Sequence, residues 1–247
     1  LSWKFMNDYK WSVKKLLKEI MMSATYRQDS KFTPELLEKD PFNKLYGRGA
    51  RVRLSAEQVR DQGLCISGLL NEKMFGPSVF PYQPKGIWLS PWNGAYWQKS
   101  QGNDQYRRAV YTYWKRTAPY PSMLTFDGTA REVCTARRIR TNTPLQALVT
   151  LNDSAYVEMA RYFAYRMESQ GKDVKQQISK GYEMALYKSI SMPDLSVLVK
   201  LYNESLQKFK KDRDKTCEMI GVDDKHNNPE TAAMVVVARS VFSPMPA

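Results

Sequence analysis

The 247-residue sequence has little of several residue types on which metal and catalytic sites depend. It contains one histidine and three cysteines, with no Cys-x-x-Cys pair and no Cys-x-x-Cys-His motif. This argues against a zinc site or a covalently attached haem within the chain. Three cysteines allow at most one internal disulfide, so disulfides do not define the fold. The longest uninterrupted apolar run is Ala232 to Ala238, which is too short to cross a membrane.

What the sequence has in excess is positive charge. It carries 38 Lys+Arg against 25 Asp+Glu, and its content of 43% hydrophobic and 12% aromatic residues is too high for a disordered chain. A net charge of +13 favours anionic partners by long-range attraction. Nucleic acid, anionic polysaccharide, an acidic protein and anionic lipid all satisfy this condition, and charge alone does not choose among them.

Apolar residues recur at helical spacing in most of the readable segments. From Val13 to Ala24 they form one stripe, with lysines on the opposite side. Signals for helix starts lie at Thr33-Pro34, Ser55, Thr143-Pro144 and Asn228-Pro229, and helical patterns cover 156–167, 174–187 and 193–211. The sequence predicts a mostly α fold, with one multi-helix domain over 1–247. We expect a long irregular loop at 75–102 and a polar loop at 212–228.

The irregular middle segment is rich in aromatic residues and proline. Six aromatic side chains lie within residues 80–97. Flat rings bind sugars or bases, and Tyr82, Trp88, Trp92 and Trp97 are the candidate platform. The alternative is that these rings fold back and cover the helical core, because large aromatic side chains supply much of the buried area of any core.

Arginine is concentrated at 48–60 and 107–140, where lysine is nearly absent. The planar guanidinium group suits paired hydrogen bonds with sulfate, phosphate or carboxylate. The candidate anion-binding residues are Arg107, Arg108, Arg131, Arg137, Arg138 and Arg140. The arginines just before Thr143 are also placed to direct an anion to the start of the helix predicted there. The alternative is a network of internal ion pairs, since acidic residues lie nearby in the sequence.

Candidate acid–base residues are few. Asp127, Glu132 and Asp153 are acidic residues in or near the second arginine window, and Cys134 lies between basic residues there. A cysteine nucleophile has no histidine close by, because the single histidine, His226, lies in a remote polar segment. We therefore predict no metal site and no activated nucleophile.

Several stretches resemble a planctomycete-specific domain of unknown function, the C-terminal domain of exported proteins that often carry an N-terminal cytochrome c-like domain. These stretches are 11–14 (Trp-Ser-Val-Lys), 23–28 (Ser-Ala-Thr-Tyr-Arg-Gln), 40–43, 53–57, 60–61, 67–70, 106–117 (Tyr-Arg-Arg-Ala-Val-Tyr-Thr-Tyr-Trp-Lys-Arg-Thr), 131–134 and 140–153. The resemblance covers nearly the whole chain. It carries no established reaction, so it transfers no catalytic residue.

The resemblance implies a fragment of a larger protein that is located in the periplasm or at the cell surface. It implies that any haem belongs to an upstream domain, with no cofactor in this chain, and that polysaccharide use is the context. Together with the arginines, it predicts a module that binds a sulfated or carboxylated glycan or docks the upstream domains, with no nucleic acid as partner. The alternative is an enzyme that acts on an anionic polysaccharide through Asp/Glu acid–base groups.

Overall fold

The computed structural model describes residues 1–84, 86, 96–116 and 118–242. These residues contain eleven α-helices, two short 3-10 helices and no β-strand, which confirms the predicted mostly α fold. Contacts divide the chain into two compact units, residues 1–53 and the residues from Leu54 onward. We call them the N-terminal unit and the main unit. None of the described helices combines the length and apolar character needed to cross a membrane.

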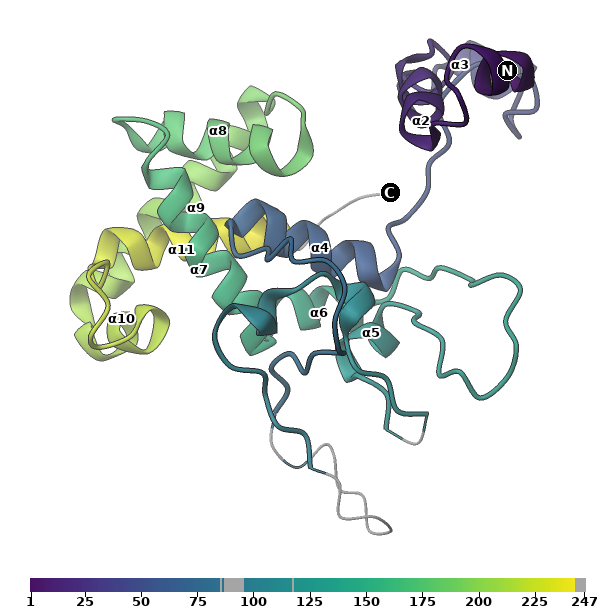
Figure 1. The fold of residues 1–247 in the computed structure, drawn as a ribbon. Coiled ribbons are helices and arrows are strands. Elements are labelled where there is room, and N and C mark those ends of the chain that lie inside the picture. The colour runs from purple at the N-terminus through teal and green to yellow at the C-terminus, as the bar shows by residue number, and fades with distance from the viewer. Residues whose placement is uncertain (85, 87–95, 117, 243–247) are drawn as a thin grey trace. The chain divides into compact units, whose positions relative to one another are not determined.

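The helices of each unit follow one another along the chain with short connections in most places (Figure 1). The N-terminal unit contains α1 (Ser2–Asn7), α2 (Val13–Met22) and α3 (Pro34–Lys39). The main unit contains α4 (Ala56–Ser67), η1 (Gly102–Tyr106), η2 (Ala109–Tyr111), α5 (Pro121–Thr125), α6 (Pro144–Asn152), α7 (Ser154–Glu168), α8 (Val174–Leu186), α9 (Met192–Lys211), α10 (Arg213–Ile220) and α11 (Pro229–Phe242).

The predicted helix starts are confirmed, and local hydrogen bonds explain them. A reciprocal capping box joins Ser55 and Gln58 at the start of α4, and Thr143 and Gln146 form another at the start of α6. The side-chain oxygen of Asn228 accepts a hydrogen bond of 2.7 Å from the backbone N–H of Thr231 in the first turn of α11. Each side chain satisfies a backbone donor that the helix itself leaves without a partner.

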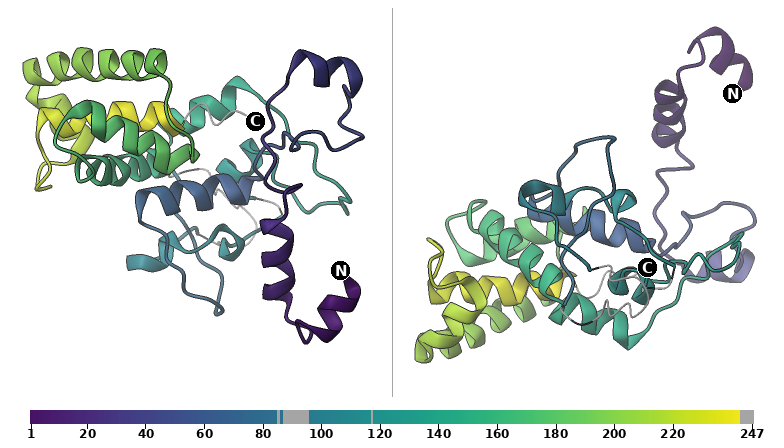
Figure 2. Two further views of the ribbon diagram at one scale, coloured as in Figure 1. Left: turned by 90° about the horizontal axis from the view of Figure 1, so that it is seen from above. Right: turned by 60° about the horizontal axis from the view of Figure 1, so that its bottom comes forward.

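The core of the main unit is built around α7, which contacts α4, α6, α8 and α11. The views in Figure 2 show α11, in yellow, running beside the helices of this bundle. Phe163 and Met167 of α7 are fully buried, and each such side chain contributes about 1.5–3 kcal/mol through burial. Helix α8 comes so close to α7 that a β-carbon at Gly181 would lie 2.7 Å from side-chain atoms of Met167. Glycine is therefore the residue that lets the two backbones approach.

The prediction of a polar loop over 212–228 is wrong for its first half, which forms α10. Asp212 caps this helix by accepting a hydrogen bond from the backbone N–H of Lys215. Thr216 and Ile220, four residues apart, are buried on one side of it. The segment is highly charged, and its few apolar residues span only a short stretch of helical spacing. Its composition therefore favoured a loop in the prediction.

The middle segment has neither helix nor strand in its described parts, 75–84 and 96–101. An isolated parallel bridge between Val79 and Thr112 attaches it to the rest of the main unit, and a second one, between Asn71 and Arg107, lies just before it in the chain. The backbone N–H of Val79 donates to the carbonyl of Tyr111 at 2.8 Å. Near Val79 the segment thus lies beside η2 and is hydrogen-bonded to it without forming a sheet.

The buried side chain of Arg107 holds the beginning of this segment in place through hydrogen bonds. Its side chain is only 1% exposed. The guanidinium group donates to the carbonyl oxygens of Lys73, Phe75 and Pro77 at 2.5–3.3 Å and stacks over the Tyr111 ring at 3.9 Å. Residues 73–77 have no regular partner for these carbonyls, and a single cation satisfies three of them.

We expect Arg107→Met to lower the free energy of unfolding by about 3 kcal/mol, because it removes a buried cation and leaves three partly buried carbonyls without donors. The neighbouring Arg108→Met is the matched control: Arg108 is half exposed and forms one long ion pair with Asp61, so its loss should cost less than about 1 kcal/mol. Urea unfolding of both variants measures the difference. Equal costs would contradict the structural role of Arg107.

Candidate anion-binding site

The loop between α5 and α6 is the longest described connection in the main unit, and its two ends are fastened together. It extends away from the helices and returns beside them (Figure 1). The carboxylate of Asp127 accepts hydrogen bonds from the backbone N–H and the hydroxyl of Thr141, at 2.7 and 2.9 Å. We call residues 127–141 the arginine loop, because four arginines lie between these closing residues.

Asp127 serves as a clamp at the base of the arginine loop. It adopts a left-handed backbone conformation with φ 61°, which aspartate tolerates better than most residues. Gln146, in the first turn of α6, also donates to the Asp127 carboxylate, at 3.3 Å. A carboxylate of the chain itself therefore lies beside the first turn of α6, close to where we expected an external anion.

The arginine loop borders a hollow of about 390 Å³. Three guanidinium groups contribute to its lining, and the remaining lining residues are mostly polar. The lining residues are Arg116, Thr129, Arg131, Glu132, Val133, Cys134, Thr135 and Arg138. Arg116 is the only one that the loop does not supply, since it lies before α5. The hollow therefore joins two segments of the arginine-rich window.

Arg138 holds the loop against α4. Its Nη1 atom donates to both carboxylate oxygens of Glu57, at 2.9 and 2.7 Å. This hydrogen bond lowers the pKa of the Glu57 carboxyl below its usual value, and partial burial opposes the shift. Both side chains remain partly exposed, so the pair contributes modestly to stability but fixes the position of the loop.

Arg131 and Arg116 are the cations of the hollow that no acidic side chain neutralises among the described residues. The Arg131 guanidinium lies 5.4 Å from the centre of the Trp114 ring, a cation–π contact that orients it without using its hydrogen-bond donors. Arg131 itself adopts a left-handed conformation, with φ 60°. These two side chains offer the donors that an anion requires.

The structure does not bring all six predicted arginines together. Arg107 is buried in the scaffold described above, and its donors are used by carbonyls. Arg108 pairs with Asp61 at 3.3 Å and lines a different hollow, of about 560 Å³, together with Glu72 and Tyr187. Arg137 and Arg140 are exposed on the arginine loop outside the lining of the first hollow. Arg131 and Arg138 are the predicted residues that share it.

The three candidate acid–base residues lie in different environments. Asp127 is the clamp, and Glu132 is exposed at the hollow. Asp153 caps α7 by accepting from the backbone N–H of Ala155 at 2.8 Å; burial raises the pKa of its carboxyl, and this backbone hydrogen bond opposes the shift. Only Glu132 therefore combines exposure with a place in the hollow.

The described aromatic candidates face inward. Trp97 stacks on Tyr120 with ring centres 5.7 Å apart, and its indole N–H donates to the carbonyl of Pro81 at 2.7 Å. Tyr82 packs against the main core. Trp88 and Trp92 lie outside the described residues. The two aromatic side chains that can be placed thus cover the core, as in the alternative stated above.

No group of three or more potential metal ligands occurs among the described residues. His226 stacks on Tyr165 at 4.0 Å, and the Tyr165 hydroxyl donates to Asp224 at 3.0 Å. The polar segment around the histidine is therefore held by ring stacking and hydrogen bonds.

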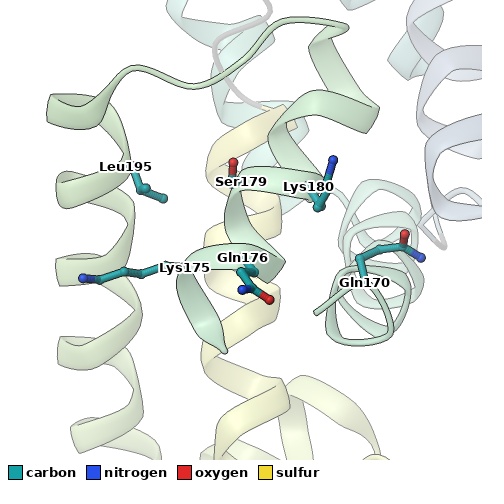
Figure 3. A pocket seen from close by; sticks show the side chains of 6 residues that line it. All are labelled: Gln170, Lys175, Gln176, Ser179, Lys180 and Leu195. Atoms are coloured by element: carbon teal, nitrogen blue, oxygen red, sulfur yellow. The ribbon is translucent and has the colours of Figure 1, made fainter. Parts of the chain in front are cut away.

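A third hollow, of about 310 Å³, lies at α8 and α9 (Figure 3). Its lining residues are Gln170, Lys175, Gln176, Ser179, Lys180 and Leu195. None of these residues is an arginine or a carboxylate. Lys180 is paired with Glu183 at 2.9 Å. The arginine loop is therefore the stronger candidate for binding an anion.

The sequence did not indicate that Arg116 lines this hollow or that Glu57 pairs with Arg138. Arg116 lies fifteen residues before Arg131, and only the return of the chain through α5 brings the two together. Glu57 was recognisable as an acidic residue at the start of a helix, but its partner is 81 residues away. No local pattern indicates either pairing.

Comparison with curated proteins finds no match, and comparison with solved structures finds none either. A family model described as a protein of unknown function (DUF1553) matches residues 1–202, which is most of the chain. On this match, the chain belongs to the DUF1553 family.

Proposed function

We propose that the main unit binds a sulfated or carboxylated glycan, and that the arginine loop is the binding element. The observation that carries the proposal is the hollow in which Arg131 and Arg116 lie without acidic partners among the described residues. Guanidinium groups donate paired hydrogen bonds to the oxygen atoms of a sulfate ester or carboxylate. Thr129 and Thr135 supply hydroxyl groups at the same hollow, which suit the hydroxyl groups of a sugar.

The fixed position of the arginine loop supports its role in binding a glycan. The Asp127–Thr141 clamp closes its base, and the Arg138–Glu57 pair fastens its far part to α4. A loop whose position is fixed before binding loses less conformational freedom when a ligand arrives. The clamp therefore contributes to affinity although it does not touch the ligand.

The environment of the acidic residues favours binding over catalysis. Two carboxylates flanking one bond are the usual requirement of glycoside hydrolysis. Here Asp127 accepts hydrogen bonds from Thr141 and Gln146, and Asp153 caps α7. Glu132 is then the one candidate left at the hollow, which suits recognition better than acid–base chemistry.

The proposal includes a cellular context. We propose that the chain is part of an exported protein of the periplasm or cell surface, and that any haem belongs to an upstream cytochrome c-like domain. The second role that we propose for the arginine loop is to dock that upstream domain. The net charge of +13 supports an anionic partner in either case.

We expect Arg131→Gln and Arg116→Gln each to weaken binding of dextran sulfate about five- to ten-fold, because each removes charge-assisted donors. Isothermal titration at fixed salt measures the affinity. Arg213→Gln, at an exposed position of α10, is the control with the same loss of charge and should bind like the parent. Equal weakening by all three substitutions would show attraction to net charge alone.

We expect Glu57→Gln to strengthen dextran sulfate binding about two- to five-fold, because freeing Arg138 and removing a nearby negative charge outweigh the loss of one of the two contacts that fix the loop. The pKa of Glu57 is lowered by Arg138, so the parent keeps the ion pair above the ordinary glutamate pKa and loses it only as pH falls through the lowered value. The difference between variant and parent should therefore stay constant from pH 7 to about pH 5. Weaker binding of the variant would assign the pair a purely structural role.

We expect Asp127→Asn to loosen the arginine loop, because an amide nitrogen replaces one of the two oxygens that Thr141 and Gln146 use. Tryptic cleavage at the loop arginines should become about five-fold faster or more, the factor that corresponds to ~1 kcal/mol of local stability. Asp173→Asn, which changes the cap of α8, is the control and should leave these cleavage rates unchanged. Unchanged cleavage in both variants would remove the clamp from the proposal.

A further inference from the structure

The N-terminal unit presents an apolar helix face that nothing within that unit covers. Val13, Leu17 and Met21 of α2 are 58%, 51% and 53% exposed. Their spacing of four residues places them along one side of the helix. Two tryptophans of the α1–α2 hairpin, Trp3 and Trp11, are also exposed. We call this surface of residues 1–22 the hairpin face.

Polar contacts on the other side fix the shape of the hairpin. Glu19 of α2 accepts a hydrogen bond of 2.7 Å from the Lys4 ammonium group of α1 and another from the Tyr9 hydroxyl. The rings of Phe5 and Trp11 meet edge to face at 5.3 Å. These contacts hold the two helices together and leave Val13, Leu17 and Met21 of the hairpin face unused.

Lysines border the apolar side chains. Lys14 and Lys18 are exposed along the edge of this apolar row, and Lys15 is exposed further round α2. The N-terminal unit as a whole carries 12 Lys+Arg against 6 Asp+Glu. A short helix with an apolar side that includes tryptophan and a lysine-rich polar side is the pattern of helices that lie in the plane of a bilayer interface.

We propose that the hairpin face binds the surface of an anionic lipid bilayer, with the apolar side chains among the acyl chains and the lysines at the headgroups. Two other occupants are a second copy of the chain and the rest of this chain, and charge argues against both. A second copy would bring equal rows of lysine together. The rest of the chain is itself basic, with 26 Lys+Arg against 19 Asp+Glu. Anionic headgroups neutralise the lysines instead, and each basic residue near such a surface adds to the attraction.

The test is co-sedimentation of the full chain with vesicles of phosphatidylcholine and phosphatidylglycerol, compared with vesicles of phosphatidylcholine alone. We expect binding to the mixed vesicles and at least ten-fold weaker binding to the neutral ones. Val13→Glu and Leu17→Glu should each weaken binding to the mixed vesicles at least ten-fold. Circular dichroism checks that both variants keep the helix content of the parent.

Val197→Glu provides the matched control. Val197 lies on α9 and is 63% exposed, so the substitution makes the same change at a similar exposure outside the hairpin. It should bind vesicles like the parent. Arg131→Gln should also bind like the parent, which separates the hairpin face from the arginine loop and keeps the two proposals independent.

Three results would overturn the proposal. The first is no binding to the mixed vesicles, and the second is equal loss in Val13→Glu and Val197→Glu. The third is a concentration-dependent dimer in sedimentation equilibrium that Val13→Glu abolishes, which would assign the hairpin face to a second copy of the chain.

Discussion

The burial of α7 is the constraint on which the main unit depends. This helix contacts four others, and its Phe163 and Met167 have no exposed surface. The segments that carry the proposed site attach to its neighbours: the arginine loop begins after α5 and ends at α6, and Glu57 belongs to α4. Apolar packing around one helix thus determines where the polar groups of the loop meet.

The helices were the most predictable part of the fold, because their starts carry local chemistry. Ser55 and Thr143 satisfy backbone donors three residues away, so the sequence alone indicates where α4 and α6 begin. Helix α10 also begins at a local cap, Asp212, but its sequence is highly charged and its apolar residues are few. Thr216 and Ile220 are buried only by contacts that the rest of the bundle provides.

The site was predictable as a region but not residue by residue. Arginine enrichment identified the window 107–140, yet adjacent members of it have opposite roles. Arg107 and Arg108 link the two 3-10 helices, and their side chains lie in different surroundings. One enters the interior and one faces Asp61. Composition cannot distinguish them, because the difference depends on which side of the segment the carbonyls of residues 73–77 occupy.

The clamp between Asp127 and Thr141 also has a consequence for how the family can vary. Because the ends of the loop are joined to each other beside α6, residues inserted between them would not displace the helices. Doubling the length of such a closed segment costs only about 0.6 kcal/mol of chain entropy. A longer or shorter intervening stretch is therefore compatible with the same bundle, so the hollow can change its lining without any rearrangement of the helices.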